Sequence, residues 1–287
     1  EWSISKQTWA SYNTALRRAL EAEEFSGIEM KPPFSENVVL TFAAFLVQEK
    51  NLKPESIGVY LAGLLKWENL MGYETATLWS PRVKAFLKGC KNARAAKETT
   101  GEAKTSKRVA ITLQMLKYLG SWIQHNSGMS EMDKMGFWAI SITCWCASMR
   151  IGEVTSRYET SFDPQCVLLF GEIKFESLKS RKGKVFEVAR VRVKSPKINR
   201  TGNGDLITVY GMRNVDGSPS NICPIKALKK YRNMRMMKER VEAWEPAFVQ
   251  ENGKCWSGTR VNAVLSLAFT GVVEGGEVVS SHSYRSG

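Results

Sequence analysis

The segment Val185-Phe186-Glu187-Val188-Ala189-Arg190-Val191-Arg192-Val193 is the part of this 287-residue chain that decides its fold class. Apolar and charged side chains alternate along it, which is the two-residue period of a β-strand with one buried face. Strand-like segments flank it at residues 167–175 and 206–210, and a Gly-Asn-Gly turn at 202–204 precedes the second of these. Helices are expected on either side, at 112–125, 130–149, from 224 onward, and at 257–268. This order predicts a mixed α+β domain with a small antiparallel three-stranded sheet at one edge.

Residues 5–92 show a different pattern, in which apolar side chains recur only at helical spacing. Ser35 is a candidate cap for the second helix, Pro54 suits the first turn of the third, and Ser80-Pro81 suits the start of a fourth. These signals predict a compact helical bundle. The chain is long enough for two domains, each with its own core.

The segment 93–107 carries no large apolar side chain and therefore lacks the means to anchor itself in a core. It is predicted to be a basic interdomain linker, either as a solvated connector or as a segment that follows a phosphate backbone. The predicted domains are thus residues 1–92 and 108–287, with this linker between them.

The charge balance points to a polyanionic partner. The chain has 41 Lys and Arg against 28 Asp and Glu, a formal charge of +13 and a pI near 9.5, which favours nucleic acid. Six cysteines stand without a Cys-x-x-Cys pair and with only two histidines, which indicates reduced thiols in an intracellular protein and argues against a zinc site. The longest nearly unbroken apolar run, 135–149, is too short to span a bilayer, and no signal peptide is recognisable, so a soluble protein is expected.

Two short motifs carry residues suited to phosphate chemistry. Arg150 and Glu153 follow the apolar helix predicted at 130–149, and His282 and Arg285 stand three residues apart near the last residue of the sequence. An arginine grips two phosphate oxygens with its planar fork and keeps its charge at any physiological pH. Residues three apart are neighbours on a helix, so His282 and Arg285 are expected on one face.

Together, the stretches Ala147-Ser148-Met149-Arg150-Ile151-Gly152-Glu153 and Ser281-His282-Ser283-Tyr284-Arg285-Ser286-Gly287 resemble the two catalytic boxes of the tyrosine recombinases, the phage-integrase family. The second stretch is most similar to eukaryotic mobile-element recombinases of the DIRS or Crypton type. The resemblance implies a SAM-like, core-binding DNA-binding domain at 1–92 and a catalytic domain at 108–287. The chain departs from the family in carrying Tyr284 where a leucine is usual. The family's nucleophilic tyrosine would follow Gly287, so the catalytic domain is expected to be C-terminally incomplete, with no nucleophile and no cleavage activity in the chain as it stands.

In this family a lysine on the hairpin between the second and third strands acts as the general acid. The matching stretch is 193–202, in which Lys197 takes the catalytic place and Lys194 is the alternative. Residues 174–200 hold ten basic side chains against two acidic ones, so most of them are expected to face DNA phosphates. The predicted DNA contacts are Lys107, Arg108, Lys182, Lys184, Lys194 and Arg200.

The resemblance implies that Arg150, Lys197, His282 and Arg285 surround the scissile phosphate, with Glu153 in support. A complete enzyme would break and rejoin double-stranded DNA through a covalent phosphotyrosine intermediate, as a dimer or tetramer on DNA, in recombination and integration. No metal or other cofactor and no membrane is implied. The location would be the nucleus in a eukaryote and otherwise the cytoplasm or nucleoid. Two alternatives stay open: a domesticated, non-catalytic DNA-binding protein derived from a recombinase, and an enzyme similar to type IB topoisomerases.

Overall fold

The computed structural model describes residues 6–73, 79–100, 107–179, 181, 183, 185–194, 204–214, 218, 220–275 and 277–286, with the backbone alone at 6, 7, 285 and 286. The chain divides into two compact units, residues 1–105 and 106–287.

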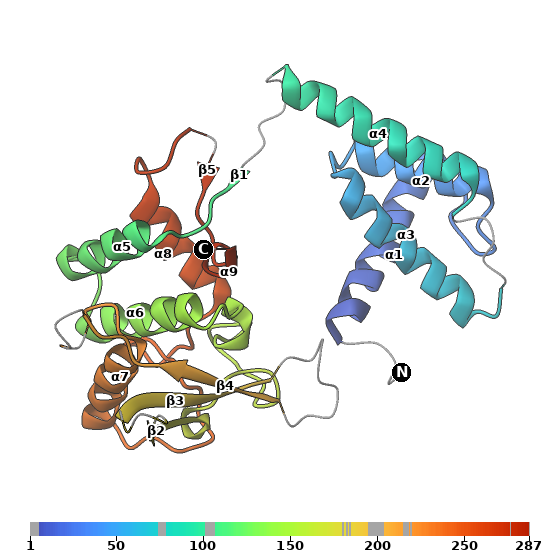
Figure 1. Cartoon of the computed structure of the whole chain (residues 1–287). Helices are drawn as coiled ribbons and strands as arrows, with labels where there is room; N and C mark the ends of the chain where they lie inside the picture. Colours follow the sequence, from blue (N-terminus) through green and yellow to red (C-terminus); the bar gives the residue numbers. More distant parts are fainter. Residues whose placement is uncertain are drawn as a thin grey trace. The chain divides into compact units, whose positions relative to one another are not determined.

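The described part of the first unit is helical, as the sequence predicts. Ser35 caps the second helix by accepting a hydrogen bond from the Val38 amide, and Ser80 caps the fourth in the same way. Pro54 is the first residue of the third helix, where its missing N–H costs nothing. The helices, drawn in blue to teal in Figure 1, are α1 (Lys6–Ser26), α2 (Glu36–Gln48), α3 (Pro54–Leu70) and α4 (Pro81–Thr99).

Helix α4 differs from the prediction at its C-terminal end. It continues to Thr99, so the linker expected at 93–107 begins inside a helix. Alanine is the strongest helix former, and Ala93, Ala95 and Ala96 keep the segment helical although they bury little surface. An ion pair between Arg94 Nε and Glu98 Oε1 at 3.1 Å, one turn apart, adds to this. A segment without large apolar side chains is thus helical as far as Thr99.

The second unit combines helices with a three-stranded antiparallel sheet of order β2-β3-β4, and the predicted fold class is confirmed. Ile173 pairs with Val191, which pairs with Ile207, and this row of apolar residues faces the core. The elements in Figure 1 are β1 (Lys107–Arg108), α5 (Leu113–His125), α6 (Glu131–Cys146), the 3₁₀ turns η1 (Ile151–Glu153) and η2 (Phe170–Glu172), β2 (Ile173–Lys179), β3 (Val185–Val193), β4 (Asp205–Tyr210), α7 (Pro224–Lys238), α8 (Gly258–Phe269), β5 (Glu277–Val278) and α9 (Ser283–Ser286).

The first strand of the three-stranded sheet, β2, begins later than the sequence suggests. Residues 167–170 were expected to be extended within it, but the segment ends in the turn η2, and β2 starts only at Ile173. Val167 and Leu168 are nevertheless buried, with 3% and 1% of their surface exposed. Their apolar character reflects burial in a loop rather than a place in the sheet, and periodicity alone does not separate the two.

Helix α6 is the centre of the second unit. Phe137, Ile140 and Cys144 on it are fully buried, in agreement with a run that is apolar nearly all round. Gly136 lets α6 approach its neighbours, because a Cβ there would lie 2.9 Å from Trp256 Nε1 and 3.1 Å from the ring of Tyr231. The core therefore fixes the C-terminal end of α6, from which the chain leads to Arg150.

Within the described residues, no helix is both long and apolar enough to cross a membrane.

Candidate phosphate-binding site

A tight turn after α6 brings Arg150 to the surface. Ser148 has φ +50°, a left-handed conformation that few non-glycine residues adopt, and the Met149 amide donates to the Cys144 carbonyl at 2.9 Å. This 6→1 hydrogen bond with a left-handed residue before it is the Schellman arrangement that ends helices. Met149 turns inward, with 1% of its surface exposed, and the Arg150 side chain is 42% exposed.

Glu153 orients Arg150 by accepting two hydrogen bonds from it. The Arg150 amide donates to Glu153 Oε2 at 2.8 Å, and its Nη1 donates to Oε1 at 3.1 Å. The carboxylate side chain is only 15% exposed. The Glu153 carboxylate therefore orders both the backbone and the guanidinium of Arg150, as expected of a supporting residue. Because a guanidinium has five N–H donors, further donors of Arg150 stay available to a ligand.

Arg150 and His282 line the same pocket, although they come from distant parts of the sequence. The pocket has a volume of about 280 Å³, and Arg108 contributes a second arginine to its wall. Two permanent cations and an imidazole around one small cavity favour an anion, and the arginine fork matches phosphate in particular. The described lining residues are Arg108, Val109, Ala110, Arg150, Ser281, His282 and Ser283.

The wall that carries His282 is built by hydrogen bonds from several segments. The Ser281 amide donates to Asn262 Oδ1 at 2.7 Å, and the Ile111 amide donates to the Ser283 carbonyl at 3.0 Å. The parallel pairing of β1 with β5 places Arg108 beside Val278. The segment just after the linker thus lies against the C-terminal segment, and this pairing brings Arg108 into the pocket.

Tyr284 is buried beneath this wall and does not line the pocket. Its side chain is 1% exposed, and its hydroxyl donates to Ser141 Oγ on α6 at 2.7 Å. Burial raises the pKa of the Tyr284 phenol far above its usual range. A phenol in this position packs α9 against α6 and is unsuited to nucleophilic attack.

The other predicted site residues are placed as follows. Lys194 is engaged inside the protein, with Nζ 2.7 Å from Glu172 Oε1 and 2.6 Å from the Pro164 carbonyl, and its side chain is 12% exposed. Those contacts weigh against Lys194 as a DNA contact or a general acid.

Lys107 is 81% exposed, with Nζ 3.7 Å from Glu277 Oε1. For Arg285 the structure describes the backbone alone, in α9 and three residues after His282. Outside the described residues lie Lys182, Lys184, Lys197 and Arg200.

Part of the pocket was not predictable from the sequence. Arg108 was predicted only as a DNA contact, and Ser281 and Ser283 were not singled out, yet all three line the cavity. A two-residue strand pair between segments so far apart in the sequence has no local signal, so Arg108 was not recognisable as a pocket residue. Across the described residues, no group of three or more His, Cys, Asp or Glu side chains is arranged to hold a metal ion.

No protein-family model matches this sequence, and no curated protein matches it either. Among solved structures, the chain is similar to a lambda integrase dimer bound to a COC' core site, with a TM-score of 0.54 and 12% identity over 99% of this chain. It spans 63% of the length of that integrase chain. XerA recombinase is a more distant neighbour, with a TM-score of 0.34 and 14% identity over 98% of this chain and 75% of the other. The chain thus has the fold of lambda integrase, a helical domain followed by an α+β domain with a three-stranded antiparallel sheet.

Proposed function

We propose that this chain is the DNA-binding core of a tyrosine recombinase, which breaks and rejoins double-stranded DNA through a covalent phosphotyrosine intermediate. The observation that supports this most is the single pocket lined by Arg150, His282 and Arg108. Phosphodiester cleavage develops negative charge on the non-bridging oxygens, and preorganised cations in a partly enclosed site stabilise that charge. The likeness of fold to an integrase supports the same assignment.

Each residue has a distinct role in this proposal. Arg150, held by Glu153, grips the non-bridging oxygens of the scissile phosphate, and Arg285, three residues after His282, supplies the second catalytic arginine. His282 accepts a proton or donates a hydrogen bond to the phosphate. Lys197 protonates the leaving oxygen, and the internal contacts of Lys194 support this choice over Lys194.

The attacking tyrosine is not one of the described residues of the pocket. Tyr284 is buried and hydrogen-bonded to Ser141, and the described lining contains no tyrosine. A tyrosine from elsewhere has to supply the nucleophile. The 287 residues by themselves should then bind DNA without forming a covalent adduct with it, and a domesticated, non-catalytic DNA-binding protein remains the second candidate on the same observation.

Double-stranded DNA is the proposed partner, with the protein acting as a dimer or tetramer. The formal charge of +13 supports a polyanionic partner, and the integrase neighbour is itself a dimer bound to a core site. We propose that a mobile element encodes the protein. The protein would then act inside the cell, in the nucleus if the source is eukaryotic.

Salt dependence of duplex binding tests the DNA-binding part of the proposal. Each phosphate contact releases counterions, so a protein that makes about six contacts should lose roughly a thousandfold in affinity between 50 and 200 mM salt. Fluorescence anisotropy with a labelled duplex measures this directly. A binding constant that does not change over that range would remove the electrostatic basis of the proposal.

A further inference from the structure

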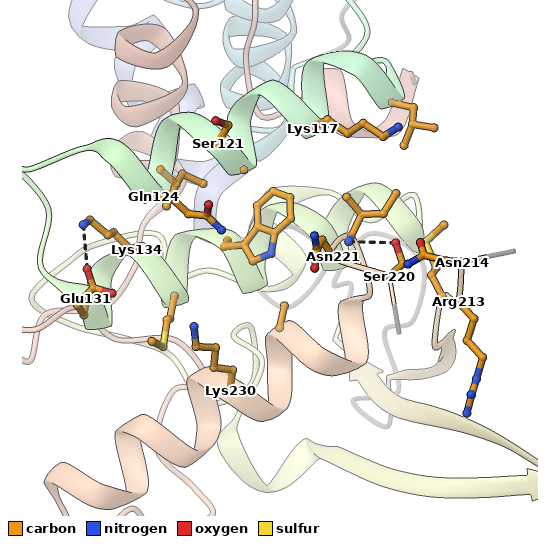
Figure 2. Close-up of a pocket in the computed structure, with 18 residues that line it drawn as sticks. Lys117, Ser121, Gln124, Glu131, Lys134, Arg213, Asn214, Ser220, Asn221 and Lys230 are labelled. Carbon is orange, nitrogen blue, oxygen red and sulfur yellow. Dashed lines mark hydrogen bonds and ion pairs between the residues drawn. The ribbon is translucent and has the colours of Figure 1, made fainter. Parts of the chain in front are cut away.

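A second cavity in the same unit shares no residue with the phosphate-binding pocket. It has a volume of about 1050 Å³ and lies among α5, α6, the start of α7 and the loop that follows β4 (Figure 2). We call it the α5–α7 groove. The described residues that line it are Leu113, Lys117, Gly120, Ser121, Ile123, Gln124, Glu131, Lys134, Met135, Trp138, Met212, Arg213, Asn214, Ser220, Asn221, Ile222, Ala227 and Lys230.

The groove is long and has helical walls. The α5 residues that line it run from Leu113 to Gln124 at helical spacing, so this wall is about 16 Å long at 1.5 Å per residue. Helix α6 supplies a second wall from Glu131 to Trp138. None of the described lining residues belongs to a strand, so no sheet edge is offered to an extended peptide. A trough between two helices suits a third helix, whose side chains pack into the grooves between theirs.

The floor of the groove is apolar. Met135, Trp138, Met212 and Ile222 are packed against the core but remain partly exposed to the cavity. Gly120 brings α5 close to the indole, since a Cβ there would lie 3.1 Å from Trp138 Cη2. A partly exposed indole beside two thioethers is a surface that takes up branched or aromatic side chains of a partner.

The rim of the groove carries an excess of positive charge. Among the described lining residues, the cations are Lys117, Lys134, Arg213 and Lys230, and the one acid is Glu131. Figure 2 shows Lys134 joined to Glu131, with Nζ 2.8 Å from Oε1, and this contact, with a smaller effect of Lys230, lowers the pKa of the Glu131 carboxyl. Lys117 and Lys230 are exposed and form no salt bridge with the described residues.

We propose that the α5–α7 groove binds an amphipathic, acidic helix of a partner protein, with its apolar side chains over Trp138 and its carboxylates over Lys117 and Lys230. Charge complementarity selects this occupant, because Lys117 and Lys230 are exposed and form no salt bridge with the described residues. Duplex DNA would pair with the lysines but would leave the apolar floor uncovered. The inference does not depend on recombinase activity.

The test uses the intact chain and three labelled peptides of about 18 residues, long enough for a stable bound helix. The first carries leucines at i, i+3, i+4 and i+7 flanked by glutamates, the second carries lysine for each glutamate, and the third is a scrambled form of the first. The matched protein variants are Lys117→Glu/Lys230→Glu and Lys174→Glu/Lys254→Glu. The control pair changes net charge equally at exposed lysines outside the groove.

The acidic peptide should bind the wild-type chain and the control variant alike. Its affinity should fall by roughly tenfold or more in Lys117→Glu/Lys230→Glu, because attraction at two rim positions becomes repulsion, and the lysine peptide should bind that variant better. Circular dichroism verifies that all variants remain folded. Equal binding of the acidic and scrambled peptides overturns the proposal. So does a groove variant that loses duplex affinity or self-association instead of peptide affinity, because DNA or a second copy of the chain would then be the occupant.

Discussion

The hydrogen bond between Tyr284 and Ser141 should be a structural link between the two halves of the phosphate-binding site. Tyr284 lies in α9, just after His282, and Ser141 lies in α6, which leads to Arg150. Both side chains are buried, with 1% and 0% of their surface exposed, and their oxygens are 2.7 Å apart. Removing one of the two hydroxyls leaves the other buried without this partner, whereas removing both eliminates the whole interaction.

The expected magnitudes follow from that geometry. Tyr284→Phe and Ser141→Ala should each lower the free energy of unfolding by about 1–3 kcal/mol, the cost of a buried, unsatisfied polar group. The double variant should be about as stable as the less stable single variant, so the coupling energy should equal the smaller of the two single effects, about 1–3 kcal/mol. Phenylalanine keeps the ring, so no cavity contributes to the effect of Tyr284→Phe.

Urea denaturation with hydrogen exchange of the α6 amides is the appropriate assay, because it reports on the unit of residues 106–287 rather than on the whole chain. Additive effects of the two substitutions would refute the reasoning. So would a covalent DNA adduct of the 287-residue chain that is lost in Tyr284→Phe, because Tyr284 would then be the nucleophile.

Two further predictions concern lysine and tyrosine side chains. In the protein as its gene encodes it, a substrate with a 5′-bridging sulfur should restore cleavage to Lys197→Ala, because a thiolate leaves without a proton donor. Restored cleavage in Lys194→Ala instead would transfer the general acid to that residue. Burial raises the pKa of Tyr231 from 10.0 to about 12. Tyr231 therefore ionises first in the unfolded chain, and the contribution of this one phenol to stability, fully present below pH 10, should fall by about 2–3 kcal/mol as the pH rises to about 12. Urea midpoints from pH 9 to 12 measure this loss, and a Tyr231→Phe variant that loses just as much would contradict it.

The sequence predicted those parts of the fold that have a local signal. The caps Ser35 and Ser80, Pro54 at a first turn and the alternation of 185–193 each correspond to an element boundary or a strand in the structure. The predictions failed where an apolar pattern had two meanings. Val167, Leu168 and Phe170 are buried without belonging to a strand.

The candidate site was predictable only in part, for a similar reason. Arg150 and Glu153 are close in sequence, so a single turn explains their contact. The resemblance to the tyrosine recombinases predicted that His282 lies near them. Arg108 enters the pocket through the pairing of β1 with β5, which no local pattern shows. Lys194 appeared as one basic residue among many, and its partner Glu172 becomes apparent only in three dimensions.

In the proposed function, Arg150 acts on one phosphate during cleavage. The most direct measurement compares Arg150→Ala with wild type in the protein as its gene encodes it, by trapping the covalent adduct on a nicked suicide duplex and measuring duplex affinity in parallel. Arg240→Ala is the matched control, because that arginine is 91% exposed and lies outside the pocket. We predict that Arg150→Ala reduces adduct formation by at least about a hundredfold, while duplex affinity changes by less than about threefold, since one contact among many contributes little to binding. Undiminished cleavage in Arg150→Ala, or a loss of affinity in proportion to the loss of cleavage, would contradict the claim.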